Sequence, residues 1–349
     1  MCSKVGKPAA SGVVLADDAT GALECASVLA GLGLDVALTL DAEPQVRCGM
    51  LVADTQSRHL LAAEAGRRIG RWAECKASIF KKTDSTLRGN IAAELLALLS
   101  RGPLIYVPAY PKLGRIVQDG RLLVNGIPVD QTEFARDALH PVRSSVVADL
   151  FPAGSAVPIR DAAELVRFLA VGEAKIAICD ATSDEDLQAI AESLGGKEVT
   201  VAGPSGFIGP WASLQTFPRK LPQVAPVVRK WLVVCGSRHP QSRRQAHLAQ
   251  RSGLTVLLSA PEELSPEAAA TELARRAVEL IPRGTGGVVV MGGDTAWALW
   301  RALGIRHLTP LPEVLPGVAA CLAGDLLFVT KAGGFGEDDL VTRVIERFA

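Results

Sequence analysis

The chain has 349 residues, with 37 lysines and arginines against 37 aspartates and glutamates, and 48% of its residues are hydrophobic. This balance of charge argues against a general nucleic-acid binder, because such proteins carry an excess of basic residues. The length is typical of two domains, and no apolar run approaches the roughly 20 residues of a membrane span. We therefore expect a cytoplasmic protein whose partners are neither membranes nor nucleic acids.

The cysteines and histidines show neither a disulfide pattern nor a metal-binding pattern. The seven cysteines lack CxxC spacing, and their scattered distribution is typical of reduced, mostly buried thiols. The five histidines form no HExxH motif and no cluster with cysteine, so the sequence does not support a zinc site.

Short apolar runs alternate with longer amphipathic segments along the whole chain. Continuous runs of this kind, bounded by Gly, Asp or Pro, are typical of strands buried in a parallel sheet. The pattern predicts an α/β fold with two domains, each with a mostly parallel sheet flanked by helices, and an active site in the cleft between them. The predicted strands are residues 13–16, 36–40, 50–53, 78–80, 104–107, 176–179, 198–202, 231–235, 255–259, 287–291 and 326–329.

Two irregular stretches interrupt this alternation. Residues 217–228 carry three prolines and precede a new strand, which predicts a linker between domains at 1–222 and 223–349. The stretch 106–145 is too long for a routine connection, and its Asn125-Gly126 pair predicts a functional loop that contains a small hairpin.

Two adjacent carboxylates, Asp17 and Asp18, follow the first predicted strand. Ligands of open α/β sheets collect beyond the C-terminal ends of the strands. Asp18 or Thr20 is a natural N-cap for the helix that follows, and capping accounts for one of these residues. It does not account for a pair of carboxylates, which suits either a divalent metal or a general base.

The strand at 78–80 leads into the sequence KKTDSTLRGN at 81–90, in which seven of ten residues are charged or carry a hydroxyl group. Such a loop before a helix can hold a carboxylate or a polyol through an arginine fork, hydroxyl groups and backbone N–H groups. The alternative is a solvated turn in which Asn90 caps the following helix.

The strand at 287–291 is followed by Gly292 and Gly293, and we expect Asp294 or Thr295 to open a helix. A strand, a glycine pair and a helix N-terminus together can form a phosphate cradle. The segment has neither a Walker A motif nor the GxGxxG pattern, and a glycine turn needed for packing is the alternative.

Two further strand ends in the C-terminal part carry glycines. Lys331 precedes the glycine-rich sequence AGGFG, which can wrap a phosphate chain. Cys235-Gly236-Ser237-Arg238 repeats the arrangement of a strand followed by Gly and Ser. Nucleotide and polar-ligand signals thus fall in different domains, which indicates transfer of a group between two substrates.

These residues resemble the four-carbon acid sugar kinases, which use ATP to phosphorylate threonate, erythronate or 3-oxo-tetronate. The matching motifs occur in the family's order and cover the chain almost end to end. Differences from the family pattern fall at Ala332 and Arg238-His239, and the chain is shorter between about 155 and 230. The motifs are ADDATGA at 16–22, DTQSR at 54–58, KKTDSTLRGN at 81–90, PAYPKLGR and DGRLLVNG within 108–126, GSRHP at 236–240, GGDTA at 292–296 and KAGGFG at 331–336.

The resemblance implies a sugar-acid-binding domain at 1–222, a nucleotide-binding domain at 223–349, and ATP with Mg²⁺ as cofactors. It implies that Asp17 or Asp18 lies near the attacking hydroxyl, while the metal ligands stay unassigned. The implied substrate-binding residues are Thr20, Arg58, Lys82, Asp84, Ser85 and Arg88, with Arg88 on the substrate carboxylate. The implied ATP-binding residues are Ser237, Gly292, Gly293, Asp294, Thr295, Lys331, Gly333, Gly334 and Gly336.

Two other functions stay open on the sequence alone. One is a sugar-acid sensor of the same fold with little or no catalysis. The other is a metal-dependent phosphohydrolase of the haloacid dehalogenase type, although that chemistry uses DxDxT and here the second carboxylate comes one position early. The sequence does not choose among the four-carbon acids or their stereoisomers, and a homodimer is the default expectation for such an enzyme.

Overall fold

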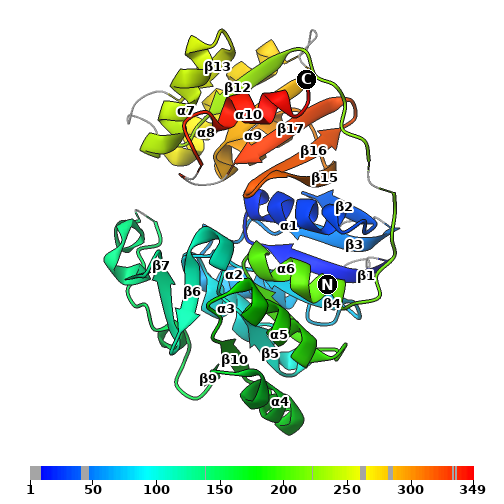
Figure 1. The fold of residues 1–349 in the computed structure, drawn as a ribbon, viewed down its shortest axis with the longest axis vertical. Coiled ribbons are helices and arrows are strands. Elements are labelled where there is room, and N and C mark those ends of the chain that lie inside the picture. Colours follow the sequence, from blue (N-terminus) through cyan, green and yellow to red (C-terminus); the bar gives the residue numbers. More distant parts are fainter. Residues whose placement is uncertain are drawn as a thin grey trace. The chain divides into compact units, whose positions relative to one another are not determined.

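The structure is a computed structural model that describes residues 9–40, 47–137, 139–221, 223–259, 265–281, 286–331, 334 and 336–349. Its contacts divide the chain into two compact units (Figure 1). Unit 1 comprises Met1–Asp17 and Ala42–Arg219, and unit 2 comprises Asp18–Asp41 and Lys220–Ala349.

Unit 1 is built on a parallel sheet flanked by helices, as predicted (Figure 1). The paired strands of this sheet all run parallel. One strand of this sheet ends in Val13, Val14, Leu15 and Ala16, which are all fully buried, because helices cover both faces of a sheet of this type. In sheet order the strands are β3 (Arg47–Asp54), β1 (Ala9–Ala16), β4 (Ser78–Lys82), β11 (Thr200–Gly203), β5 (Leu104–Tyr106), β10 (Ile176–Cys179) and β9 (Ala156–Ile159).

Local signals set the ends of several helices in unit 1. Asp161 caps the start of α4, and Ser183 and Asp186 form a capping box at the start of α5. Gly172 and Gly195 end these two helices in the left-handed conformation. The helices are α2 (Ala62–Gly70), α3 (Ile91–Leu96), α4 (Ala162–Val171), α5 (Asp184–Leu194) and α6 (Ser205–Ser213).

The predicted hairpin in the irregular stretch is confirmed. Asn125 and Gly126 both have positive φ, 49° and 82°, as a tight two-residue hairpin turn requires. The chain then continues through two short 3₁₀ helices, η3 and η4. The elements are β6 (Arg115–Gln118), β7 (Arg121–Val124), β8 (Ile127–Pro128), η3 (Val129–Gln131) and η4 (Glu133–Arg136).

Unit 2 contains a mixed sheet. Its first four strands in sheet order run parallel, whereas the last three pair antiparallel. Neither β15 nor β16 was predicted. Pro310 and Pro312 argue against a strand at β15, and Pro312 lies within the register shift between Leu311 and Leu315. In sheet order the strands are β13 (Thr255–Leu258), β12 (Trp231–Cys235), β14 (Gly287–Met291), β17 (Leu326–Lys331), β16 (Val318–Ala323), β15 (His307–Leu315) and β2 (Val36–Thr39).

The units differ from the predicted domains 1–222 and 223–349 chiefly in residues 18–41, which contain α1 and β2 of unit 2; the later boundary lies at 219/220 instead of 222/223. Helix α1 packs on β15 and β16, where the Ser27 hydroxyl donates to the Ala320 carbonyl at 3.3 Å. These partners lie 293 positions apart, so chain order alone did not reveal the contact. The helices of unit 2 are α1 (Ala19–Gly31), α7 (Pro240–Arg251), α8 (Pro266–Leu280), α9 (Gly293–Ala302) and α10 (Leu340–Glu346).

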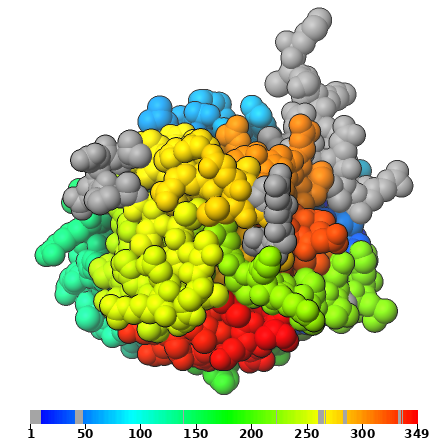
Figure 2. All heavy atoms as spheres, turned by 90° about the horizontal axis from the view of Figure 1, so that it is seen from above, coloured from blue at the N-terminus to red at the C-terminus, as the bar shows by residue number. Residues whose placement is uncertain are grey.

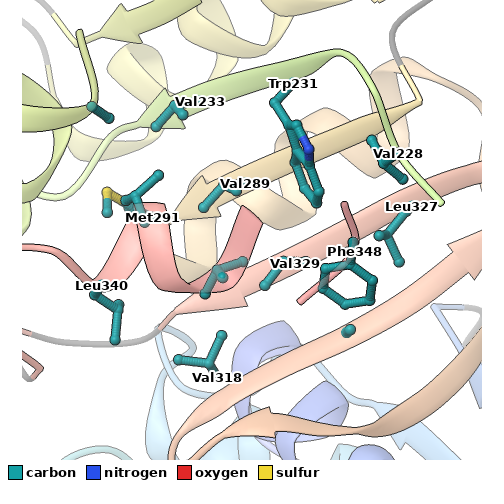
Figure 3. Packing of buried hydrophobic residues seen from close by; sticks show 14 of the residues in the cluster. Val228, Trp231, Val233, Val289, Met291, Val318, Leu327, Val329, Leu340 and Phe348 are labelled. Atoms are coloured by element: carbon teal, nitrogen blue, oxygen red, sulfur yellow. The ribbon is translucent and has the colours of Figure 1, made fainter. Parts of the chain in front are cut away.

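The core of unit 2 lies between its sheet and the C-terminal helix (Figure 3). Val233, Val289 and Val329 come from three parallel strands and are buried together with Leu340 of α10. Helix α10 also contacts α7, and in Figure 2 the red C-terminal residues adjoin the yellow-green residues of this region. The core thus fixes the strand ends from which the glycine-bearing loops emerge.

Within the described part of the chain, no helix is long and apolar enough to cross a membrane. Of the described cysteines, Cys25, Cys179, Cys235 and Cys321 are buried, as expected for mostly buried thiols.

Candidate active site

Asp17 lies directly after β1, at the C-terminal edge of the unit 1 sheet. It is 2% exposed and accepts two hydrogen bonds from Arg58, from Nε at 2.7 Å and from Nη2 at 3.1 Å. Burial alone would raise the pKa of Asp17, but Arg58, Lys81 and Lys82 outweigh it and lower the pKa to about 2. Asp17 is therefore a fixed anion and a poor proton acceptor at neutral pH.

Asp84 and Arg88 form a second fork in the loop after β4. The Arg88 Nε and Nη2 atoms donate to the two Asp84 oxygens at 3.2 and 2.8 Å, and the Thr86 amide also donates to Asp84. Burial opposes ionisation of Asp84, but Arg88 and Arg58 hold its pKa well below the usual range. The two arginines are linked through this carboxylate, because Arg58 Nη2 lies 3.8 Å from Asp84 Oδ2.

Arg88 has a second carboxylate partner that the sequence did not indicate. Its Nη1 atom donates to Asp137 Oδ2 at 3.2 Å, and its guanidinium carbon lies 5.2 Å from the centre of the Phe134 ring. Arg88, the residue predicted to bind the substrate carboxylate, is thus already bound by two protein carboxylates in this structure.

A buried ion pair lies beneath these groups. Lys81 Nζ is 3.0 Å from Glu94 Oε2, both side chains are at most 2% exposed, and the Ser57 hydroxyl donates to Glu94. Burial raises the pKa of Glu94, and the positive charge of Lys81 partly offsets this shift. A signal for Glu94 existed, because it shares the helical spacing of the buried Ile91, Leu95 and Leu98.

The remaining predicted residues of this loop lie close by. The Lys82 ammonium donates to the Thr83 carbonyl at 2.9 Å, and Ser85 is half-buried. Asn90 is the N-cap residue of α3 but makes no side-chain capping bond, contrary to the alternative drawn from sequence. Its amide instead donates to three carbonyls of the loop after β3, and so fixes the segment that carries Arg58.

Asp18 belongs to unit 2, although it adjoins Asp17 in the sequence. It is the N-cap of α1, as expected: its carboxylate accepts from the Gly21 amide at 2.8 Å and the Thr20 hydroxyl at 3.0 Å. A Cβ placed on Gly293 would lie 3.0 Å from Thr20 Oγ1 and 3.5 Å from Asp18 Oδ2. The start of α1 thus lies against the start of α9. Thr20, which was predicted to bind the substrate, lies at this contact in unit 2 and not among the charged residues of unit 1.

Glycines let the loops after β12 and β14 approach each other closely. Gly292 has φ of 116° and is the N-cap of α9, so the expectation that Asp294 or Thr295 opens the helix was wrong. A Cβ on Gly236 would overlap the Thr295 hydroxyl, and one on Gly292 would lie 3.4 Å from the Ser237 amide nitrogen. Asp294 is exposed in the first turn of α9. These loops form a backbone surface at a helix N-terminus, which suits an anion.

Lys331 ends β17 and is 2% exposed. Its ammonium donates to the Ser242 hydroxyl of α7 at 3.1 Å, and burial lowers its pKa to about 8. Gly334 packs against the His239 ring, and the Gly336 carbonyl accepts from Gln241 at 2.8 Å. Ala332 and Gly333 lie outside the described residues.

A separate cavity of about 420 Å³ lies elsewhere in unit 1, beyond the ends of β9 and β10. Asp119, Arg160, Asp161 and Asp180 are among its lining residues, none of which was predicted to bind either substrate. Within the described residues, no group of three or more His, Cys, Asp and Glu could hold a metal ion.

Comparison with known proteins assigns both halves of the chain. A model of a sugar-binding N-terminal domain matches residues 12–210, and a model of a nucleotide-binding C-terminal domain matches residues 260–341. A D-threonate kinase of Bordetella bronchiseptica is 31% identical, over 95% of this chain and 96% of that protein. A 3-oxo-tetronate kinase of Cupriavidus necator is 26% identical, over 95% of this chain and 96% of that protein.

A solved structure from Bordetella bronchiseptica, described as a domain of unknown function with bound citrate in a domain-swapped dimer, is 30% identical and has a TM-score of 0.53. The match covers 98% of each chain. Together with the two matching domain models and the order of the motifs, these similarities show that the chain belongs to the family of the four-carbon acid sugar kinases.

Proposed function

We propose that this protein is an ATP-dependent kinase that phosphorylates the terminal hydroxyl group of a four-carbon sugar acid. The observation that carries the proposal is the cluster of Arg58, Asp84 and Arg88 at the strand ends of unit 1. This cluster of charged side chains lies within the residues matched by the sugar-binding domain model. An anionic, hydroxyl-rich substrate needs both cationic forks and hydrogen-bond acceptors, and the cluster supplies both.

On the acid side, Arg88 binds the substrate carboxylate, and Asp84 holds the plane of its guanidinium. Lys82 and Ser85 supply donors, and Arg58 adds positive charge while it is fixed by Asp17. The citrate in the related solved structure supports a site for carboxylate compounds in this family.

On the nucleotide side, Gly292, Gly293 and Ser237 present backbone to the phosphates, and Asp294 and Thr295 lie in the first turn of the same helix. Gly334 and Gly336 extend this surface, and Lys331 contributes positive charge from the end of β17. Glycine at 292 and 293 fits this role, because a Cβ there would lie within 3.5 Å of neighbouring polar atoms.

The carboxylate at the start of α1 fits Mg²⁺, which is usually held by one or two carboxylates together with phosphates and waters. Asp18 would be such a ligand, since it lies beside Gly293 at the start of α9. A bound Mg²⁺ would neutralise charge on the phosphates of ATP. We assign Asp17 and Asp18 different tasks: Asp17 fixes Arg58 on the acid side, and Asp18 serves the nucleotide side.

The contribution of the chain to this reaction is positioning and charge, which dominate enzymatic phosphoryl transfer. The two forks hold the acid in one orientation, so that one hydroxyl is presented as the acceptor. Because the pKa of Asp17 is about 2, it orients the acid-binding residues rather than removing the hydroxyl proton. We further propose a cytoplasmic location and a homodimer, the latter supported by the dimeric relative.

Release of ADP, measured with D- and L-threonate, D- and L-erythronate and 3-oxo-tetronate, tests the function. We expect ATP-dependent turnover with at least one of these acids. Acid binding without ADP release would instead support the sensor, and phosphate release from phosphorylated acids without nucleotide would support the phosphohydrolase. In the same assay, the Asp17→Asn variant should raise the KM for the acid and the Asp18→Asn variant the KM for MgATP; equal effects on both would contradict the division of tasks.

A further inference from the structure

The segment that follows β8 contacts Arg88 and a neighbouring loop of unit 1. We call residues 129–140, without the undescribed Ala138, the arm. Its Phe134 ring faces the Arg88 guanidinium, and its Asp137 carboxylate accepts from Arg88 Nη1 at 3.2 Å. A third contact is the stacking of His140 on His59, with ring centres 5.6 Å apart. The arm therefore lies on both loops that carry the arginine forks.

The two carboxylates on Arg88 are held differently. Asp84 is 8% exposed and accepts from the Thr86 amide and hydroxyl as well as from three nitrogens of Arg88. Asp137 is 26% exposed and makes a single contact with Arg88, through one of its oxygens. Asp84 is thus built into the loop, whereas the bond of Asp137 to Arg88 is the one that a ligand could replace.

We propose that Asp137 competes with the substrate carboxylate for Arg88 and thereby sets the affinity of the enzyme for its acid. The inference rests on the proposed function, in which Arg88 binds the carboxylate of the acid. An incoming carboxylate takes the place of the Asp137 oxygen at Nη1, so Arg88 keeps an anionic partner in the free and the bound state. In the free enzyme, the Nη1 atom of this half-buried guanidinium is then always hydrogen-bonded to Asp137.

The structure offers a substitution that isolates this contact. The other oxygen of Asp137, Oδ1, accepts from the Leu139 and His140 amides at 3.1 and 2.9 Å. In the Asp137→Asn variant the side-chain carbonyl can keep these two bonds, while the amide group no longer attracts the guanidinium. The arm should keep its turn and lose only its competition for Arg88.

For the Asp137→Asn variant we expect the KM for the acid to fall about fivefold, because a partly exposed ion pair of this kind is modest in strength. The KM for ATP should not change. Acetate, a carboxylate without hydroxyl groups, should inhibit the variant at correspondingly lower concentration than the wild type. A KM for the acid that stays the same or rises would overturn the proposal, since a rise would mean that Asp137 itself binds substrate or only supports the arm.

Two controls separate competition from other effects. Glu133→Gln removes the same charge from an exposed position on the arm and should leave the KM for the acid within twofold of the wild type. In an Arg88→Ala background the Asp137→Asn substitution should have no further effect; a persisting effect would also overturn the proposal. Melting temperatures show whether each variant is folded, and Asp137→Ala, which also removes the turn acceptor, should melt lower than Asp137→Asn. Absence of ADP release from the wild type would instead reject the proposed function.

Discussion

The strand ends of unit 1 and unit 2 are built from different chemistry. In unit 1 the loops after β1, β3 and β4 meet through charged side chains, and Arg58 and Arg88 are held by Asp17 and Asp84. In unit 2 the loops after β12 and β14 meet through glycines, with Gly236 against Thr295 and Gly292 against Ser237. A chiral sugar acid is recognised by side chains held in fixed positions, whereas a phosphate chain can be bound by backbone N–H groups at the start of a helix.

The difference extends to the layer beneath each site. Unit 1 places a buried ion pair, Lys81 with Glu94, below its forks. Unit 2 instead places Lys331 next to its glycine loops, with the ammonium bonded to the Ser242 hydroxyl. Substitutions should therefore cost stability in unit 1 and change nucleotide binding in unit 2.

The largest effect should come from Lys81→Met. It leaves Glu94 buried without its cation, and we expect the free energy of unfolding to fall by about 3–5 kcal/mol. Because a protonated Glu94 is tolerated in the core, the loss should be smaller at pH 5 than at pH 8. Urea denaturation at both pH values measures it.

Lys112→Met provides the matched control in the same unit. Lys112 is paired with Asp184 at 3.7 Å, but both side chains are well exposed, so the loss should stay below about 1 kcal/mol. Similar losses for the two variants would contradict the structural role given to the buried pair.

Gly292→Ala should have a smaller effect, limited to the binding of ATP. A φ of 116° strains any residue with a side chain, by about 1–3 kcal/mol, and the added methyl group would lie 3.4 Å from the Ser237 amide nitrogen. The KM for ATP should rise about tenfold while the KM for the acid stays constant, since about 1.4 kcal/mol corresponds to a factor of ten.

Gly304→Ala separates strain from binding. Gly304 also has a positive φ, 69°, but a Cβ there meets no atom within 4 Å. This variant should lose some stability and bind ATP normally. An equal rise in the KM for ATP in both variants would show that strain in unit 2, rather than the cradle, is responsible.

The sequence predicted this contrast only in part, and the reason is physical. Apolar runs and glycine-bearing strand ends are local signals, so most of the parallel strands and the glycine loops were found in the right places. The parallel strand β9 was missed. Strand β15 was missed because its two prolines argue against a strand; Pro310 nevertheless pairs with Cys321, and Pro312 lies within a register shift. Strand β16 was missed as well, although it contains no proline. The placement of 18–41 depends on contacts with residues far along the chain.

The site itself was predicted as a set of residues but not as a network. Charge and position identified Asp17, Arg58, Asp84 and Arg88, yet no local pattern states that the two arginines are already ion-paired. Asp137 lies in an irregular stretch, where nothing in the spacing points to Arg88. Pairings of this kind depend on three-dimensional placement and were visible only in the structure.

The smallest expected effect concerns pH and distinguishes the cations of the two units. Burial lowers the pKa of Lys331 to about 8, whereas arginines stay charged throughout the accessible range. As the pH rises from 7 to 9, Lys331 loses its charge, so the KM for ATP should rise severalfold while the KM for the acid stays constant. In the Lys331→Met variant the KM for ATP should be higher at pH 7 and nearly independent of pH. If the variant keeps the pH profile of the wild type, another group titrates, and the charge contribution assigned to Lys331 is wrong.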